Sequence, residues 1–127
     1  MDVSFYVFPG SHPCEAVLAA ARYKGIPHRV IHVPPVWHRI QMKLMFGGLT
    51  VPAMKIGADK TQGTRAIMRA LEAAEPEPPL YPSDATLCAA VIEAEGWGAG
   101  PFQDIGRRFI WSHLVRATPV MRSWVDN

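Results

Sequence analysis

The sequence has little cysteine, with only two such residues among 127. Cys14 and Cys88 are far apart in the chain and lie in different sequence contexts. Two thiols are too few for a disulfide scaffold or a cysteine-based zinc site. The five histidines show no metal-ligand spacing, so we expect no bound metal. Because free thiols suit a reducing compartment, we expect a cytoplasmic protein.

The sequence also lacks a strong charge of either sign and a long apolar run. Its formal net charge is +2, and Arg107-Arg108 is the only adjacent basic pair, which argues against a nucleic-acid partner. No apolar run approaches the roughly 20 residues that a membrane-spanning helix needs. The opening stretch MDVSFYVF lacks the basic start of a secretory signal. We therefore expect neither a membrane partner nor a leader.

The first third of the chain has the pattern of a β-α-β unit. Residues 3–8, VSFYVF, are β-branched and aromatic and are followed by a Pro-Gly step, as expected of a buried strand. A helix follows, with Pro13 in its first turn, where a missing N–H is harmless, and with Gly25 as its stop. Residues 28–33 alternate apolar and polar side chains and predict a second strand. The two strands should pair in parallel through a right-handed crossover.

The next segments predict a helix, a β-hairpin and another helix. We expect a short helix at 36–46, strands at 53–56 and 61–62 joined by a turn at 57–60, and a helix that Thr64 caps. The predicted order is β-α-β-α-β-β-α, which makes an α/β fold with a mixed sheet.

Proline is abundant, with 12 residues, and several of them form the stretch PEPPLYP at 76–82. This stretch cannot continue a helix and predicts an extended connector. Either Ser83 or Asp84 then caps a new helix. The glycine-rich segment 96–101 lacks the lysine of a phosphate loop and is expected to break that helix. A second helix should follow at about 102–116.

These elements predict a domain at 1–75, a linker at 76–84 and a partial helical part at 85–127. The helical part has room for about two helices. Its aromatic side chains would leave an apolar patch unless the remainder of a longer protein, or the second copy in a homodimer, covers them. These aromatic residues are Trp97, Phe102, Phe109, Trp111 and Trp124.

A Ser-His-Pro-Cys tetrapeptide lies where the first strand meets the first helix. There, the hydroxyl of Ser11 can donate a hydrogen bond to a bound thiolate, which the helix dipole also favours. Serine is equally common as a plain helix cap, and both interpretations stay open here. We expect His12 to face solvent in the turn, with tuning of the site as the alternative. We expect Cys14 to be a small buried apolar residue, with a monothiol role as the alternative.

Three motifs together resemble the N-terminal half of a glutathione transferase, and most closely its bacterial, theta-like type with serine at the active position. They are the Ser-x-Pro-Cys step, a Val-Pro pair before the hairpin, and a Gly-Thr-Arg-Ala-Ile run that opens the next helix. The proline-rich connector also resembles the interdomain linker of that family. The resemblance covers residues 1–82 well and 83–127 only weakly.

The resemblance implies a thioredoxin-like domain followed by a partial all-helical domain. It implies that Ser11 stabilises the thiolate of glutathione, or of another low-molecular-weight thiol, for attack on an electrophilic small molecule. It implies a cis Pro52, with the backbone of Val51 holding the main chain of the thiol compound. Thr64, following Gly63, would receive the carboxylate of that compound at a helix N-terminus. We expect no metal to take part.

Some residues depart from the family pattern. Gly63 replaces the usual acidic residue, and Thr50 replaces a basic one, which leaves room for a thiol other than glutathione. Trp37 or His38 would supply a replacement contact, although core packing is the preferred role for Trp37. A non-catalytic thioredoxin-fold interaction module is the alternative function. A glutaredoxin-like reductase is disfavoured because Ser11 replaces the first cysteine of a Cys-x-x-Cys motif.

Overall fold

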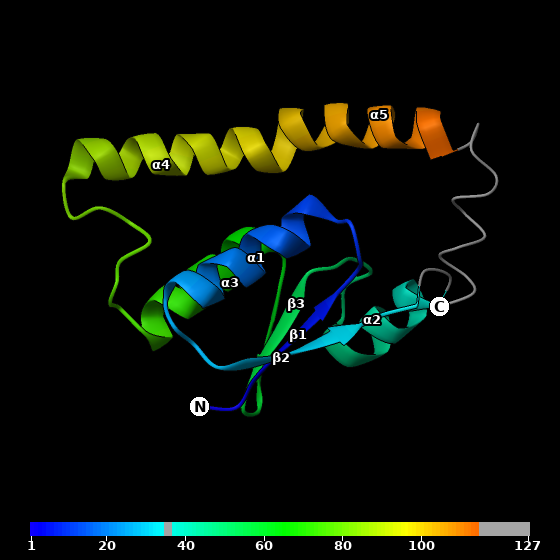
Figure 1. Ribbon diagram of the computed structural model, residues 1–127, viewed down its shortest axis with the longest axis horizontal. Helices are drawn as coiled ribbons and strands as arrows, with labels where there is room; N and C mark the ends of the chain where they lie inside the picture. Colours follow the sequence, from blue (N-terminus) through cyan, green and yellow to red (C-terminus); the bar gives the residue numbers. More distant parts are fainter. Residues whose placement is uncertain (35–36, 115–127) are drawn as a thin grey trace. The chain divides into compact units, whose positions relative to one another are not determined.

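The computed structural model of the chain describes residues 1–34 and 37–114. The described chain divides into a first unit, Met1–Pro82, and a second unit that begins at Ser83. The first unit has the predicted order β-α-β-α-β-β-α (Figure 1). Its elements are β1 (Val3–Val7), α1 (His12–Tyr23), β2 (His28–His32), α2 (His38–Phe46), β3 (Ala53–Ile56), β4 (Asp59–Gln62) and α3 (Thr64–Ala74).

The four strands form one mixed sheet in the order β2-β1-β3-β4. β1 pairs in parallel with β2, as the predicted crossover requires, and antiparallel with β3. In the β3–β4 hairpin, Ile56 pairs with Asp59, so that only Gly57 and Ala58 form the turn. The predicted four-residue turn at 57–60 was therefore wrong. Asp59 and Lys60 join the strand because Gly57, with a φ of 57°, allows a two-residue turn.

Helices cover both faces of β1, and this explains why all of its residues are buried. Val3, Phe5 and Val7 pack in one cluster with α1 and α3. Tyr6 points the other way and packs in a second cluster with Met42 of α2. The first unit therefore has three layers, with α1 and α3 on one face of the sheet and α2 on the other. The arrangement is the predicted thioredoxin-like fold.

The tryptophan before α2 does not have the predicted core role. Trp37 is the N-cap residue of α2, and 65% of its surface is exposed. α2 buries only Met42 completely, and Met45 and Phe46 near its end also pack against the second cluster. Core packing by Trp37 was therefore a wrong prediction, because the helix turns a narrower face to the sheet than its apolar content suggested.

The second unit consists of α4 (Ala85–Trp97), a π-helical turn (Gly98–Phe102) and α5 (Gln103–Leu114). The side chain of Asp84 caps α4 by accepting a hydrogen bond of 2.9 Å from the N–H of Leu87. The predicted helix break at 96–101 was wrong, because the backbone continues through the π-helical turn. Pro101 lies inside that turn, and the wider turn accommodates a residue that has no N–H to donate. Residues 115–116 of the predicted second helix, and the tail after them, lie outside the described residues.

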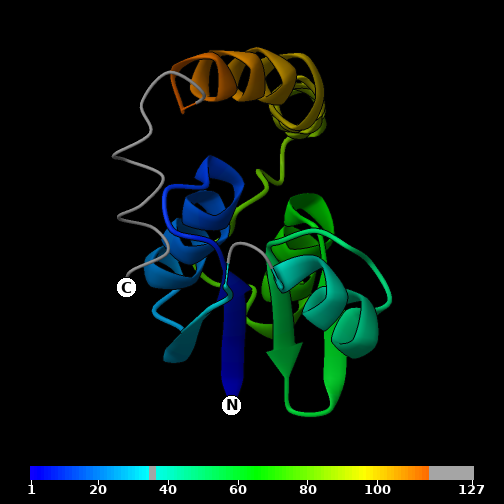
Figure 2. The same ribbon diagram turned by 90° about the vertical axis from the view of Figure 1, so that its right-hand side faces the viewer.

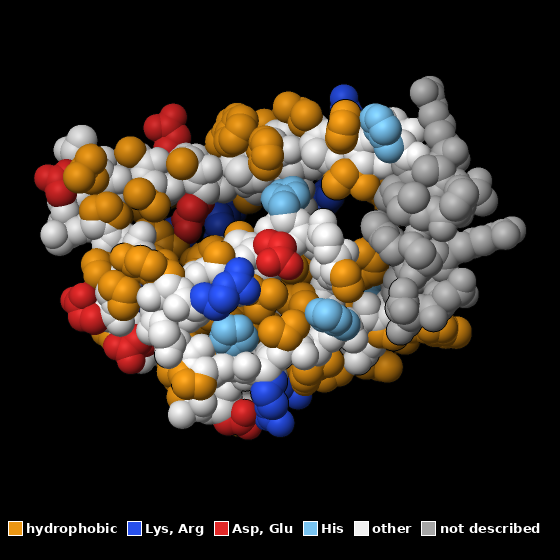
Figure 3. All heavy atoms as spheres, in the orientation of Figure 1, with side chains coloured by type: hydrophobic (Ala, Val, Ile, Leu, Met, Phe, Trp, Pro, Cys, Tyr) orange, Lys and Arg blue, Asp and Glu red, His pale blue; other side chains and the backbone are white. Residues whose placement is uncertain are grey.

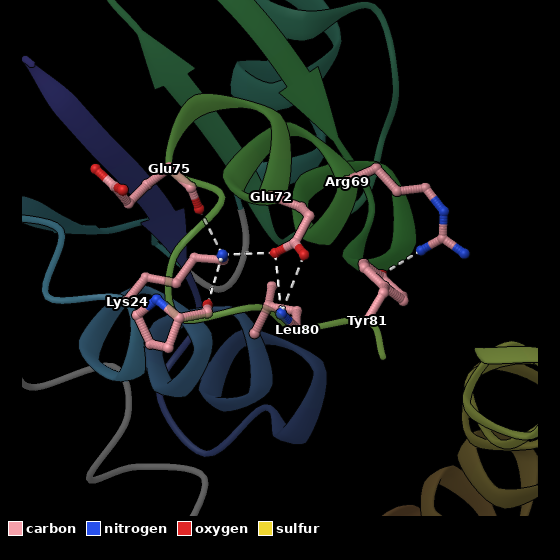
Figure 4. A network of polar contacts seen from close by, with 7 residues as sticks. Lys24, Arg69, Glu72, Glu75, Leu80 and Tyr81 are labelled. Carbon is pink, nitrogen blue, oxygen red and sulfur yellow. Dashed lines mark hydrogen bonds and ion pairs between the residues drawn. The ribbon is translucent and has the colours of Figure 1, made fainter. Parts of the chain in front are cut away.

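The proline-rich segment at the end of the first unit is held to α1 and α3 by a buried lysine (Figure 4). Lys24, at the end of α1, has a fully buried side chain that donates to the carbonyl oxygens of Glu75 and Pro78, at 2.5 and 2.9 Å. Its Nζ also lies 2.5 Å from a carboxylate oxygen of Glu72 on α3. The same carboxylate accepts a hydrogen bond of 3.0 Å from the N–H of Leu80. One ion pair thus connects α1, α3 and the connector.

The environment of Glu72 favours its charged form. Burial acts to raise the pKa of this carboxyl group. Hydrogen bonds from Lys24 and from the backbone of Leu80, together with the charge of Lys24, outweigh burial and lower the pKa below its ordinary value. Within the described ranges, no helix is long and apolar enough to cross a membrane.

Candidate functional site

The register of the sheet brings the predicted site segments to one edge. Tyr6 pairs with Ala53, and Ala53 pairs with Gln62, so that the end of β1, the start of β3 and the end of β4 lie side by side. The N–H of Gly63 donates to the carbonyl oxygen of Pro52 at 2.9 Å. We name residues 8–11, 51–52 and 63–64 the site edge. Figure 2 shows the N-terminus and the β3–β4 turn at the opposite end of the sheet.

Ser11 lies at the site edge as the N-cap residue of α1, but its side chain makes no capping hydrogen bond. Its carbonyl oxygen accepts the N–H groups of Cys14 and Glu15, each at 3.0 Å. The hydroxyl thus does not have the capping role that serine often has at this position.

Cys14 is completely buried in the core cluster between α1 and the sheet. Burial is the main cause that raises the pKa of its thiol, and the charge of Glu15 adds to it. Hydrogen bonds with the Ser11 side chain and the Phe8 backbone act in the opposite direction but do not offset the burial. The thiol is therefore neutral at pH 7, which favours the predicted small buried residue over a nucleophile.

The Val51-Pro52 peptide bond is cis, as the resemblance implies. Pro52 is buried, and the side chain of Val51 packs against both core clusters. Among the described residues, the turn, loop and cap hydrogen bonds include none from the backbone of Val51. Its N–H and C=O are thus the polar groups that this segment offers at the site edge. Glu77-Pro78 is a second cis bond, which sequence reasoning did not identify.

Gln62 positions the loop before Val51, a role that the sequence alone does not predict. Its Nε2 donates to the carbonyl oxygen of Thr50 at 2.5 Å. A Cβ on Gly48 would lie only 2.1 Å from the side-chain oxygen of Gln62, so this glycine permits the close approach. The available signal was the Gly47-Gly48 pair: Gly47 alone, with a φ of 86°, ends α2, and Gly48 therefore needs another reason.

The start of α3 differs in one respect from the prediction. Gly63, not Thr64, is the N-cap residue, and Thr64 is the first residue of the helix. Gly63 adopts a φ of 90°, which glycine tolerates far better than other residues do, and its carbonyl oxygen accepts the N–H of Ile67. No side chain caps the helix. The first-turn N–H groups, beginning with that of Thr64, therefore lack helical partners and favour an anion.

Two histidines flank the site edge. His12 is exposed at the start of α1, as predicted for a turn histidine. His38 begins α2, and its ring lies 6.0 Å from that of Phe8. In the part of the chain that the structure describes, no three His, Cys, Asp or Glu side chains group as metal ligands. The site edge thus offers a hydroxyl, backbone polar groups and helix N-termini, which suit a ligand with a thiol and a carboxylate.

The three-layer fold and the cis proline beside the N-terminus of α1 define a thioredoxin-like protein. Residues 5–79 match the family model described as "Glutathione S-transferase, N-terminal domain", so the chain belongs to the glutathione S-transferase family. No curated protein sequence matches the chain significantly.

Solved structures show the same fold. Human glutathione transferase theta-2, in complex with glutathione and an unknown ligand, is 27% identical with a TM-score of 0.68 and covers 76% of this chain. The theta class enzyme of Xanthomonas axonopodis pv. citri, with glutathione bound, is 21% identical with a TM-score of 0.74 over 86% of the chain. FzlA from C. crescentus is 17% identical, with a TM-score of 0.80 over 99%. The chain spans 42%, 54% and 60% of these three structures, respectively.

Proposed function

We propose that the protein binds glutathione, or another low-molecular-weight thiol, at the site edge and activates it for attack on an electrophilic small molecule. Family membership supports this proposal, as does the glutathione in the human theta-2 structure. The observation that carries it is the Ser11 hydroxyl, which lies at a helix N-terminus without capping that helix.

Each segment of the site edge has a role in this proposal. Ser11 donates a hydrogen bond to the thiolate, and the dipole of α1 stabilises the same charge. The backbone of Val51, held next to Pro52, pairs with the main chain of the thiol compound. The start of α3, at Gly63 and Thr64, receives its carboxylate.

The proposed reaction is nucleophilic addition or substitution by sulfur. The thiol loses its proton to solvent, the thiolate forms a bond to the electrophilic carbon, and in a substitution the leaving group departs with the bonding electrons. A free thiol has a pKa of about 8.5 and is mostly protonated at pH 7. Lowering that pKa raises the thiolate fraction, and holding the two reactants together removes much of the entropic barrier.

The identity of the thiol depends on two residues. Gly63 places no carboxylate where the ammonium group of glutathione would lie, and Thr50 places no cation nearby. We therefore propose glutathione as the first candidate and a thiol without an ammonium group as the second. The cytoplasm is the proposed location. The remainder of a longer protein, or the second copy of a homodimer, is proposed to cover the apolar helices of the second unit.

The test compares the wild type with Ser11→Ala in glutathione binding by calorimetry and in conjugation to a chlorodinitrobenzene. A hydrogen bond to a charged group contributes about 1.5–3 kcal/mol, so loss of the Ser11 donor should lower kcat roughly 10- to 100-fold. Ser83→Ala changes an exposed serine of the second unit and is the matched control, with activity like that of the wild type.

The opposite results would support a different function. If the wild type neither binds a thiol nor turns over the electrophile, the protein is a non-catalytic thioredoxin-fold interaction module. The missing charges at Gly63 and Thr50 favour that function. Activity that survives Ser11→Ala but is lost in Cys14→Ala would indicate monothiol redox chemistry instead.

A further inference from the structure

Two hydrogen bonds from the end of β4 hold the backbone on both sides of Val51. Before it, the side-chain Nε2 of Gln62 donates to the carbonyl oxygen of Thr50 at 2.5 Å. After it, the N–H of Gly63 donates to the carbonyl oxygen of Pro52 at 2.9 Å. Gln62 is itself fixed by the sheet, because it is the last residue of β4 and pairs with β3. The segment around Val51 is therefore attached to β4 at both of its ends.

The hydrogen bond from Gln62 sets the direction of one polar group of Val51. The carbonyl group of Thr50 and the N–H of Val51 belong to the same planar peptide unit. The Thr50-Val51 bond is trans, so these two groups point in opposite directions. Because Gln62 holds the carbonyl group, the N–H of Val51 points away from that side chain. This N–H is one of the two backbone groups that Val51 offers at the site edge.

Residues 48–51 have no other polar anchor in the part of the chain that the structure describes. They form neither helix nor strand, and the hydrogen bonds between backbone groups in turns and loops include none from them. A segment with few hydrogen bonds changes its conformation easily, and ordering it when a ligand binds costs affinity. The hydrogen bond from Gln62 therefore preorganises the N–H of Val51 for a ligand.

Gly48 leaves the space that the side chain of Gln62 occupies. A Cβ at position 48 would lie 2.1 Å from Oε1 of Gln62 and 2.7 Å from its Cδ, which is closer than such atoms can approach. The φ of Gly48 is not positive, so its backbone conformation is open to other residues as well. This position thus requires a glycine for the space beside Gln62 and not for its backbone conformation.

We propose that Gln62 is a positioning residue of the thiol site: its side chain holds the peptide group before Val51, so that the N–H of Val51 is directed at the main chain of the bound thiol compound. Gly48 makes this contact possible. The inference rests on the proposed function and concerns the binding of the main chain, whereas Ser11 acts on the thiolate. It involves no covalent or redox step, and Gln62 acts through Val51.

The test compares the wild type, Gln62→Met and Gly48→Ala in glutathione binding by calorimetry and in conjugation to a chlorodinitrobenzene. Gln62→Met keeps the length of the side chain but has no donor, and Gly48→Ala pushes the side chain of Gln62 away from its acceptor. Each variant loses one neutral hydrogen bond, so glutathione should bind roughly three- to tenfold more weakly and its KM should rise by the same factor. At saturating glutathione, kcat should stay within about twofold of the wild type, because only binding of the main chain is weakened.

Two further measurements separate positioning from a merely structural effect. S-Methylglutathione keeps the main chain but has no thiol to ionise, so its affinity should fall in Gln62→Met and stay unchanged in Ser11→Ala. Combining Gly48→Ala with Gln62→Met should weaken binding no further than Gln62→Met alone, because Gly48 acts only through Gln62. Gln103→Met, in α5 of the second unit, is the matched control and should bind glutathione like the wild type. If Gln62→Met does not fold, Gln62→Leu also lacks the donor and should give the same weaker binding.

The possible failures are distinguishable. If the wild type does not bind glutathione, the proposed function fails and this inference fails with it. If the wild type binds glutathione and both Gln62→Met and Gly48→Ala bind it equally well, only the role of Gln62 is wrong. A fall in kcat of Gln62→Met as large as the rise in KM also overturns that role, because general damage to the site then explains the loss.

Discussion

The two units of this chain use their apolar residues in opposite ways. Every side chain that the structure describes as buried belongs to the first unit, Met1–Pro82, and none belongs to residues 83–113. Figure 3 shows hydrophobic side chains on the surface along α4 and α5. The large exposed ones in the second unit are Leu87, Ile92, Trp97, Phe102, Ile105, Phe109, Ile110 and Trp111. The first unit thus has its own core, whereas the described residues 83–113 have apolar surface without one.

The sequences of two helices explain this difference. α3 has one apolar stripe, and that stripe buries Ile67 and Leu71 completely. α4 has apolar residues on all sides and buries none of them. A helix that is apolar all round is typical of a buried position in a larger assembly. Stability should therefore be high in the first unit and low in the second.

The largest expected contrast compares the same substitution in both units. Leu71→Ala removes a completely buried side chain and should lower the free energy of unfolding by about 2–5 kcal/mol. Leu87→Ala changes a side chain that is 59% exposed and should change it by less than about 0.5 kcal/mol. Urea unfolding of both variants measures this contrast. Equal losses of unfolding free energy would contradict the difference between the two units.

The next effect concerns the ion pair that fastens the connector. Lys24→Met removes the buried ammonium group that pairs with the Glu72 carboxylate and donates to two carbonyl oxygens, and should destabilise the first unit by about 2–3 kcal/mol. Arg22→Met is the matched control, because Arg22 is exposed and lies 3.9 Å from Glu15. It should cost less than about 1 kcal/mol. Similar unfolding free energies for the two variants would show that the connector is not held in this way.

The ion pair between Lys24 and Glu72 also predicts that the stability of the first unit depends on pH. The pKa of Glu72 is lower in the folded protein than in the unfolded chain, so its stabilisation is present above the ordinary glutamate pKa of about 4.3. That stabilisation is lost as the pH falls through the folded value. Glu72→Gln should therefore lower the melting temperature at neutral pH and flatten its fall in acid. If the melting temperatures of the wild type and Glu72→Gln fall in parallel with decreasing pH, the lowered pKa of Glu72 is contradicted.

The smallest effect compares two glycines. Gly63→Ala forces a φ of 90° on alanine at the start of α3 and should cost about 1 kcal/mol. Gly100→Ala lies in the π-helical turn, where an added Cβ meets nothing within 4 Å, and should be neutral or slightly stabilising. Thermal unfolding of the two variants shows whether each substitution raises or lowers the stability. If Gly100→Ala destabilises the protein and Gly63→Ala does not, the expected order is wrong.

The elements that the sequence predicted well are those with local signals. The apolar run at 3–8 and Pro13 near a helix start are properties of neighbouring residues, and β1 and α1 appear where they indicate. The burial of Cys14 follows from the period of α1, which is local too. The three motifs at the site edge come together because the strand order of the fold places them there.

The features that the sequence does not predict depend on partners far away in the chain. Lys24 gave no signal of its own, because its partner Glu75 is 51 residues distant. Gln62 and Gly48 likewise explain each other only once β4 lies beside the loop. The exposure of Trp37 depends on how much of α2 faces the sheet, and composition does not reveal it.

A glutathione titration, followed by the backbone amide resonances of the labelled protein, tests most directly whether one thiol site lies at the site edge. We expect the signals of Ser11, Val51 and Thr64 to move together with a single dissociation constant, while those of α4 and α5 stay unchanged. Movement confined to α4 and α5, or three unequal constants at these positions, would contradict one thiol site at this edge of the sheet.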